Sequence, residues 1–169
     1  MSVSGTLEVV DAAGSLSFSF DDLMRYHGSN SPGGVAHAFK VMERGFALLS
    51  PAGPPERRKI TLETAFGGPG ARDGFELVTR AVTGDRFVVD ASLARPERGR
   101  ARERFVFKLA YGDQTVTLLL REGYVSEEFI DLARKPDLSD EEDARLDQLK
   151  DEMAERVMGS AADEVYDVE

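Results

Sequence analysis

Alternating apolar and polar positions open the chain and predict a β-hairpin. The segments 7–10 and 16–20 are short apolar runs typical of strands, and they flank the turn-forming sequence Asp11-Ala-Ala-Gly14. In the second run serines separate the apolar residues, which is the period of a half-buried strand. A short helix over 23–26 is expected next, because Asp21 and Asp22 favour a first helical turn.

The clearest helical pattern runs from Pro32 to about Leu49. Ser31 is a suitable N-cap, Pro32 suits the first helical position, and the proline-rich segment 50–55 ends the pattern. One face carries apolar residues at helical spacing: Val35, Phe39, Met42, Phe46 and Leu49. This pattern predicts a largely buried helix.

Three more segments have helical patterns: 73–82, 126–134 and 139–158. The last one opens with a capping box of Ser139 and Glu142 and is followed by Gly159. Its apolar stripe suits packing on a partner helix, but packing on the rest of the chain or on the second copy in a homodimer, the expected assembly, is favoured: Leu146, Leu149, Met153 and Val157. The final residues, 163–169, are expected to fray.

Four further segments have strand patterns: 59–65, 86–93, 104–111 and 115–120. Gly112-Asp113, between the last two, is a tight-hairpin signal. The element order is therefore hairpin, helix, strand, helix and three antiparallel strands. This order predicts an α+β fold in which helices pack on one face of a mainly antiparallel sheet.

The net charge of −10 is concentrated near the C-terminus. Residues 137–169 contain 13 acidic and 3 basic residues, whereas residues 1–136 contain 18 of each. We therefore expect a neutral α+β domain over 1–136 and an acidic helical arm over 137–169. With this charge, neither nucleic acid nor an anionic membrane is expected as a partner.

Five arginines fall within ten residues: Arg95, Arg98, Arg100, Arg102 and Arg104. No aromatic residue is interleaved with them, so a solvated hairpin loop is expected rather than a nucleic-acid site. The loop is also a candidate to attract the acidic arm, either within one chain or across a homodimer.

Cysteine is absent, which excludes disulfides, thiolate nucleophiles and cysteine-ligated metals. The sequence does not open with a charged leader before an apolar stretch, and no apolar run reaches the ~18 residues of a membrane span. A cytoplasmic location is therefore the default expectation.

Two glycine-rich turns carry the candidate chemistry. The first, 26–34, leads into the predicted long helix, where free backbone N–H groups favour an anion. His27 is a candidate proton carrier or metal ligand, with a plain turn role as the alternative. His37, six residues into the helix, faces away from the apolar stripe and is either a ligand-binding or a core histidine.

The second turn, 67–76, leads into another predicted helix and carries Arg72, Asp73 and Glu76. The two carboxylates are three residues apart and share a helix face, which suits acid–base work or metal ligation. The alternative is that they are ordinary acidic residues that complement a helix dipole.

The two turns together resemble the FmdE family, which takes its name from one component of formylmethanofuran dehydrogenase. The resemblance covers about residues 20–125, with a Tyr-His-Gly turn, a Pro-Gly helix start, a strand, and Asp-Gly-Phe-Glu on a second helix. It implies an α-β-α-β-β-β domain, in agreement with the order of elements above.

The usual turn of that family is His-Gly-His-x-Cys-Pro-Gly. Here Ser29 and Ser31 stand for the second histidine and the cysteine, and Gly70 stands for a further cysteine of the family. The resemblance therefore implies a cleft with His27 and Asp73 but without the Cys/His metal centre.

We expect a cofactor-free enzyme that carries out acid–base chemistry on a small anionic organic metabolite between the two turns. His27 is the candidate general acid/base, and Asp73 would orient it or carry a second proton. Isomerisation, elimination and hydrolysis all fit such a site. The residues expected to bind the substrate are Tyr26, Ser29, Asn30, Ser31, His37, Arg72 and Glu76.

Two alternatives remain open. One is non-catalytic binding of a metal or haem through His27 and His37, and the other is an interaction module that acts through the acidic arm. The geometric test is whether His27, His37, Asp73 and Glu76 converge on one pocket.

Overall fold

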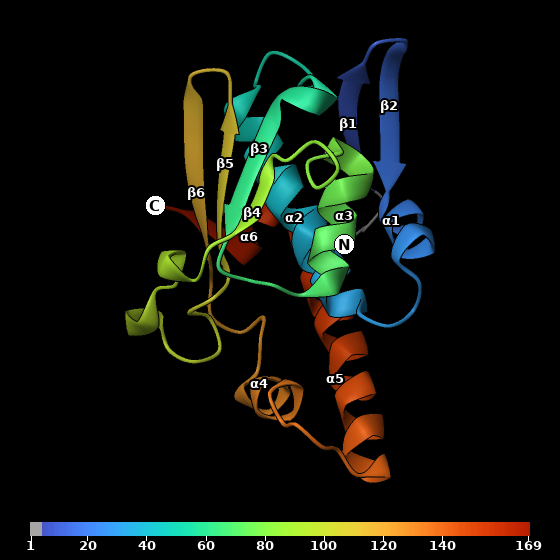
Figure 1. Cartoon of the computed structure of the whole chain (residues 1–169), viewed down its shortest axis with the longest axis vertical. Helices are drawn as coiled ribbons and strands as arrows, with labels where there is room; N and C mark the ends of the chain where they lie inside the picture. The colour runs from blue at the N-terminus through green and yellow to red at the C-terminus, as the bar shows by residue number, and fades with distance from the viewer. Residues whose placement is uncertain (1–4) are drawn as a thin grey trace.

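The N-terminal hairpin forms as predicted and stands apart from the main sheet. This computed structural model describes residues 5–169. β1 (Thr6–Asp11) and β2 (Gly14–Ser19) pair antiparallel in a two-stranded sheet of their own (Figure 1). Within residues 5–169, no helix combines the length and hydropathy that a membrane crossing needs. The expectation that the N-terminal segment is not a targeting sequence includes residues 1–4, which lie outside the described residues.

The main sheet has five strands in the order β4-β3-β5-β6-β7. Its antiparallel centre consists of three predicted strands, β3 (Ile60–Thr64), β5 (Val106–Tyr111) and β6 (Gln114–Leu120). Alternate residues of β3 are buried, as the period of a half-buried strand requires. The fold is therefore α+β with a mainly antiparallel sheet, as the pattern predicts.

Both edge strands differ from the prediction. β4 (Phe87–Val89) is short and runs parallel to β3, so the expected run of three antiparallel strands is wrong at its first member. The helix between β3 and β4 carries the chain back along the sheet, which is the connection that parallel pairing needs. β7 (Tyr166–Val168) pairs antiparallel with β6, so the expected fraying of the last residues is also wrong.

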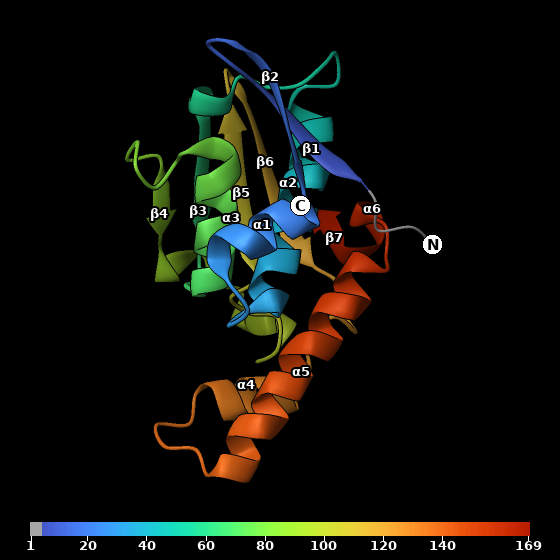
Figure 2. The same ribbon diagram turned by 90° about the vertical axis from the view of Figure 1, so that its right-hand side faces the viewer.

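Three helices lie on one side of the main sheet (Figures 1 and 2): α1 (Phe20–His27), α2 (Pro32–Leu49) and α3 (Pro69–Thr79). α2 has the predicted bounds and is largely buried. α3 begins earlier than predicted, because Pro69 occupies the first helical position, where its missing N–H and fixed φ are favourable. Asp73 therefore lies in the second turn of α3, and the first turn contains no acidic residue.

Glycines bring the N-terminal turns of α2 and α3 into backbone contact. A Cβ atom at Gly70 would lie 2.5 Å from the carbonyl oxygen of Ser31, and one at Gly34 would lie 3.1 Å from the backbone nitrogen of Ala71. Side chains at these two positions would keep the helices apart. The positive ends of two helix dipoles therefore lie side by side.

The acidic C-terminal segment is built into the fold as α5 (Asp140–Met158), α6 (Ala162–Val165) and β7. The apolar stripe of α5 is buried, and α5 packs on α2 so closely that a Cβ at Gly33 would lie 2.7 Å from the sulfur of Met153. An ion pair of 2.7 Å joins Arg95 of the arginine-rich loop to Glu169. The N-terminal half of α5 and the neighbouring α4 (Glu127–Ala133) extend beyond the sheet (Figure 2).

Candidate functional site

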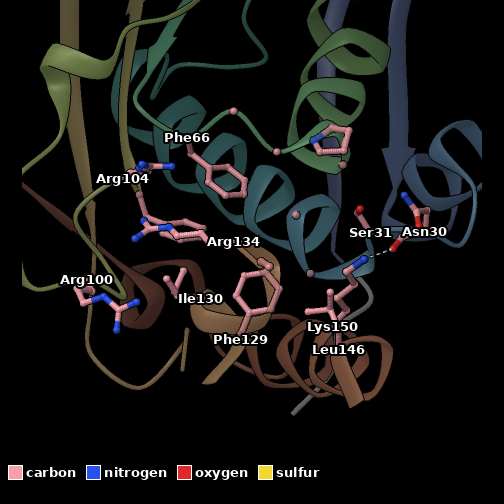
Figure 3. Close-up of a pocket in the computed structure, with 18 residues that line it drawn as sticks. Asn30, Ser31, Phe66, Arg100, Arg104, Phe129, Ile130, Arg134, Leu146 and Lys150 are labelled. Atoms are coloured by element: carbon pink, nitrogen blue, oxygen red, sulfur yellow. Dashed lines mark hydrogen bonds between the residues drawn. The ribbon is translucent and has the colours of Figure 1, made fainter. Parts of the chain in front are cut away.

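A pocket of about 490 Å³ lies where the N-terminal turns of α2 and α3 meet the arginine-rich loop, α4 and α5 (Figure 3). Four basic side chains line it: Arg100, Arg104, Arg134 and Lys150. Its apolar surface comes mainly from Phe66, Phe105, Phe129, Ile130 and Leu146. The lining contains no acidic residue. The pocket is therefore both cationic and apolar.

The basic side chains differ in how far they are neutralised. Arg100 is paired with Asp131 of α4 at 2.5 Å, and its other nitrogen lies 3.7 Å from a carboxylate oxygen of Glu127. Arg104 and Arg134 have no carboxylate within 4 Å anywhere in residues 5–169. Two guanidinium groups at the pocket are therefore available to an anion.

Lys150 brings a third available cation. Its ammonium donates a hydrogen bond of 3.2 Å to the backbone oxygen of Asn30, one residue before the cap of α2. Among residues 5–169 it has no acidic partner. An ammonium group beside the positive end of a helix is unfavourable by itself, so this arrangement favours an anion between them.

The two helix N-termini at the pocket are also bare. Neither α2 nor α3 has a side-chain cap hydrogen bond or an acidic residue in its first turn. Three other helices, α1, α4 and α5, each have a serine that caps the N-terminus by a side-chain hydrogen bond and acidic residues in the first turn. The backbone N–H groups of Gly33, Gly34 and Gly70 precede the first intrahelical bonds of α2 and α3, so they remain free to donate to a ligand.

Aromatic rings supply the apolar wall. Phe66 stacks on Phe105 with ring centroids 4.3 Å apart and an interplanar angle of 25°. Phe105 is buried, whereas Phe66 and Phe129 are half-buried and face the cavity (Figure 3). A ligand in this pocket would lie against their faces and edges.

His27 and Asp73, the two predicted catalytic residues, are in contact. The Nδ1 atom of His27, at the end of α1, lies 2.8 Å from Oδ2 of Asp73 in α3. The imidazole is only 5% exposed, and its Nε2 atom has no hydrogen-bond partner among residues 5–169. Neither residue lines the pocket. The pair is therefore adjacent to the glycine-rich turns but does not face the cationic cavity.

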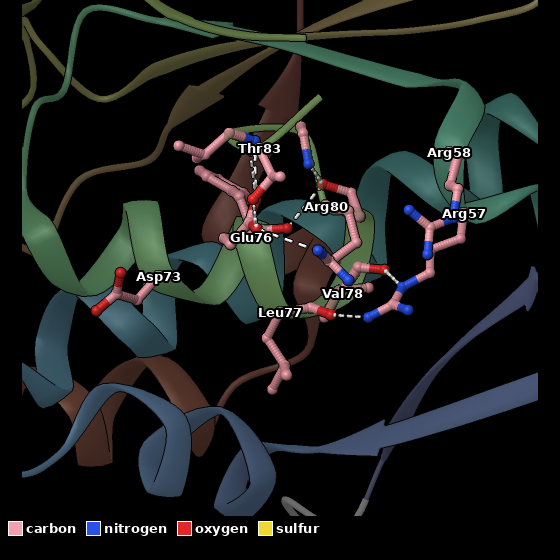
Figure 4. Close-up of polar contacts among 12 residues, drawn as sticks. Arg57, Arg58, Asp73, Glu76, Leu77, Val78, Arg80 and Thr83 are labelled. Atoms are coloured by element: carbon pink, nitrogen blue, oxygen red, sulfur yellow. Dashed lines mark hydrogen bonds and ion pairs between the residues drawn. The ribbon is translucent and has the colours of Figure 1, made fainter. Parts of the chain in front are cut away.

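The Glu76 carboxylate, near the C-terminal end of α3, is hydrogen-bonded within the protein (Figure 4). Its carboxylate accepts hydrogen bonds from the backbone N–H groups of Val82 (2.9 Å) and Thr83 (3.0 Å), from the Thr83 hydroxyl and from Arg80 (3.3 Å). Burial raises the pKa of Glu76, but these hydrogen bonds outweigh it and hold the pKa below its ordinary value. Figure 4 shows the Asp73 carboxylate apart from this cluster, so the two acids are not grouped in space.

His37 is a core residue. Its Nδ1 atom lies 2.9 Å from the hydroxyl of Tyr166, and the imidazole is fully buried beside the ring of Phe105. Burial lowers the pKa of His37 to about 3, so the ring is neutral at physiological pH. The four residues His27, His37, Asp73 and Glu76 do not converge on one pocket.

A Cys/His metal centre does not fit these residues. Within residues 5–169, no three His, Cys, Asp or Glu side chains are grouped as metal ligands. In the resemblance predicted from the sequence, Ser29, Ser31 and Gly70 take the places of the family's further ligands, and in the structure both histidines direct Nδ1 to a protein partner.

The remaining predicted ligand-binding residues divide between pocket and surface. Asn30 and Ser31 line the pocket, whereas Tyr26, Ser29 and Arg72 do not. Sequence reasoning missed Arg104, Arg134, Lys150 and the aromatic wall as site residues. The arginine-rich loop was the available signal, but its composition is equally typical of a solvated loop, which is what the sequence alone favours.

The chain matches no protein-family model, and no curated protein matches it significantly. The resemblance to the FmdE family therefore remains a prediction from the residues of the two glycine-rich turns.

Proposed function

We propose that this protein binds a small organic anion in the pocket between the α2 and α3 N-termini and the arginine-rich loop. The observation that carries the proposal is the lining itself. Three basic side chains that have no carboxylate partner among residues 5–169, Arg104, Arg134 and Lys150, meet two uncapped helix ends, and none of the described acidic residues lines the cavity. Positive groups gathered in this way repel one another until a negative charge is bound.

The size and surface of the pocket support an organic rather than an inorganic anion. A volume of about 490 Å³ far exceeds what phosphate or sulfate needs and falls in the usual range of small-molecule sites, roughly 300–1,000 Å³. The wall of Phe66, Phe129 and Ile130 has no hydrogen-bonding group to offer. It would instead cover an apolar part of the ligand.

The expected affinity of a simple probe is modest. Two charge-assisted hydrogen bonds contribute about 1.5–3 kcal/mol each. Together they correspond to a dissociation constant of millimolar order or somewhat lower. Titration followed by NMR suits this range, and the proposed amide donors are glycines, whose signals are well separated.

The test uses phenylacetate and its neutral counterpart, phenylacetamide, as probes of the ¹⁵N-labelled full chain. We expect phenylacetate to shift the amide signals of Gly33, Gly34 and Gly70, and phenylacetamide to bind at least tenfold more weakly. Equal binding of both compounds, or binding that leaves these three signals unmoved, would overturn the proposal.

Matched variants test which basic side chains of the protein bind the anion. Arg104→Gln and Arg134→Gln should each weaken phenylacetate binding several-fold. Arg25→Gln is the control, because Arg25 is an exposed arginine of α1 outside the pocket and should leave the affinity unchanged. An equal loss in all three variants would indicate a response to net charge rather than a site.

A second candidate function is acid–base catalysis by His27 on the bound anion. One observation favours it: Asp73 holds the imidazole at 2.8 Å and leaves Nε2 without a partner among residues 5–169, as in a base oriented by a carboxylate. Because Nε2 is covered, catalysis would need the adjoining turn to move. Slow chemical change of a bound carboxylate in the wild type, absent in His27→Asn, would support it, and equal rates in both proteins would refute it.

A further inference from the structure

The positive groups of the pocket form two separate clusters. The helix-end cluster consists of Lys150 and the N-terminal turns of α2 and α3, and we use the name arginine cluster for the arginines among the lining residues, Arg104, Arg134 and the already paired Arg100. Figure 3 shows Arg100 and Arg104 on one side of Phe66 and Phe129, and Lys150 with Ser31 and Asn30 on the opposite side. A ligand that contacts groups on both sides must extend past these two phenyl rings.

The surface between the clusters is apolar. Phe66 is held in place by stacking on the buried Phe105, and Phe129 and Ile130 of α4 form the facing wall. These side chains have no donor or acceptor, so a polar group at this level of the pocket would lose its hydrogen bonds to water without replacement. The part of the ligand that lies here should be a hydrocarbon or an aromatic ring.

The clusters also differ in the recognition they offer. The helix-end cluster presents backbone N–H groups in fixed directions plus one ammonium, which suits a terminal carboxylate or phosphate oxygen. The arginine cluster presents planar guanidinium groups, which suit bidentate contact with a second carboxylate or phosphate. A ligand with one charge would leave either the helix-end cluster or the exposed guanidinium groups of Arg104 and Arg134 to solvent ions alone.

We infer that the ligand is a dianion in which an apolar segment separates two terminal anionic groups, as in an α,ω-dicarboxylate or its aromatic equivalent. One end lies on the helix-end cluster, the other lies on the arginine cluster, and the apolar segment crosses between Phe66 and Phe129. The inference rests on the proposed function, because it concerns the same pocket, and it adds the class of compound and its orientation.

The experiment compares two homologous series on the wild-type full chain by titration calorimetry or NMR. One series is the straight-chain dicarboxylates from glutarate to azelate, and the other is the monocarboxylates with the same numbers of carbon atoms. We expect one chain length at which the dicarboxylate binds at least tenfold more tightly than its monocarboxylate partner. Shorter and longer dicarboxylates should lose that advantage, because they cannot place both ends.

Variants then assign the two ends. The doubly substituted Arg104→Gln/Arg134→Gln protein should bring the best dicarboxylate to the affinity of a monocarboxylate, and Lys150→Gln should do the same from the other side. Arg25→Gln should leave the ratio of the two affinities unchanged. The wild-type comparison needs no variant, so it decides the question even if a variant folds poorly.

The outcomes separate this inference from the proposed function. Equal binding of monocarboxylates and dicarboxylates at every length, with much weaker binding of neutral amides, would overturn the inference that the ligand is a dianion. The proposal of an anion-binding pocket would then still stand. Failure of both series to bind more tightly than neutral amides would overturn the pocket function itself. A dicarboxylate advantage that persists in the double arginine variant would overturn the two-cluster arrangement.

Discussion

Replacing Gly70 with alanine should force apart the two helix ends that border the pocket. The added Cβ would lie 2.5 Å from the carbonyl oxygen of Ser31, 3.0 Å from its Cβ and 3.1 Å from the backbone nitrogen of Val35. An ordinary contact of 3.4 Å requires a shift of about 0.9 Å at the first of these. Two of the three neighbours are backbone atoms, so no side-chain rotation relieves the contact, and the helices must move.

Two opposing contributions set the magnitude. Overpacking of this kind costs about 1–3 kcal/mol. Alanine is favoured over glycine in a helix by about 0.5–1 kcal/mol, which offsets part of that cost. The difference spans roughly 0–2.5 kcal/mol. Because the 2.5 Å contact is with a backbone oxygen, we expect Gly70→Ala to lower the free energy of unfolding by about 1–2 kcal/mol, in the upper part of that span.

Urea unfolding of the full chain measures this loss. With a slope near 2 kcal/mol per molar, the midpoint should fall by about 0.5–1 M. Gly53→Ala is the matched control, because a Cβ there has no neighbour within 4 Å, and it should leave the midpoint unchanged or raise it slightly. A midpoint for Gly70→Ala equal to that of Gly53→Ala would refute the backbone contact between α2 and α3.

Three further predictions concern the residues that the sequence marks as candidate chemistry. The pKa of His37 is about 3 in the folded state against an ordinary value of 6.5, so below pH 6.5 the unfolded chain binds a proton that the folded chain does not. The free energy of unfolding should therefore fall by about 1.4 kcal/mol per pH unit below pH 6.5. Urea midpoints measured against pH should show this decrease in the wild type and lose it in His37→Gln. Glu76→Ala removes the acceptor of two backbone N–H groups after α3 and should lower the free energy of unfolding by about 1–3 kcal/mol in thermal or urea unfolding. A decrease within about 0.5 kcal/mol would contradict its structural role. His27→Ala removes the hydrogen bond to Asp73 and should lower the free energy of unfolding by about 1–3 kcal/mol. Tyr26→Ala is the control and should leave that free energy unchanged, because Tyr26 is 51% exposed. Similar decreases in both variants would contradict the buried pair.

Local signals were sufficient for most of the secondary structure. α2 begins at Pro32 and ends at Leu49 as predicted, because a cap residue and proline precede its apolar face and a proline-rich segment follows it. The start of α3 was not predicted, because glycines flank Pro69 and a Gly-Gly-Pro-Gly sequence is more typical of a loop. In the fold, those glycines serve the close approach of two helices, which is a tertiary requirement that no local pattern contains.

Long-range pairing explains the two errors in the sheet. The direction of β4 depends on how α3 returns the chain to the edge of β3, and a strand pattern carries no information on direction. β7 consists of three residues in an acidic tail, and it is ordered by pairing with β6 and by burial of Tyr166 against His37. Both are contacts between residues far apart in sequence.

The candidate site was predictable only in part, for the same reason. The pairing of His27 with Asp73 joins two turns that the sequence already singles out, and Asn30 and Ser31 lie at the pocket. The cations come from segments whose composition indicates solvated surface, and only the tertiary fold turns Arg104 and Lys150 toward one cavity.

The distribution of charge shows why net charge is a poor guide to the ligand proposed for this protein. The segment 137–169 is strongly acidic, yet its contribution to the pocket lining is Leu146 and Lys150, and none of its carboxylates. At physiological salt, charges separated by more than about 8 Å are largely screened, so a bound anion responds mainly to the cations that touch it. A chain with ten excess negative charges can therefore still form a local cationic pocket, because the fold gathers four basic side chains at one cavity, three of them exposed arginines. The acidic segment still takes part in the site, since α5 is the helix that positions Lys150 beside the N-terminus of α2.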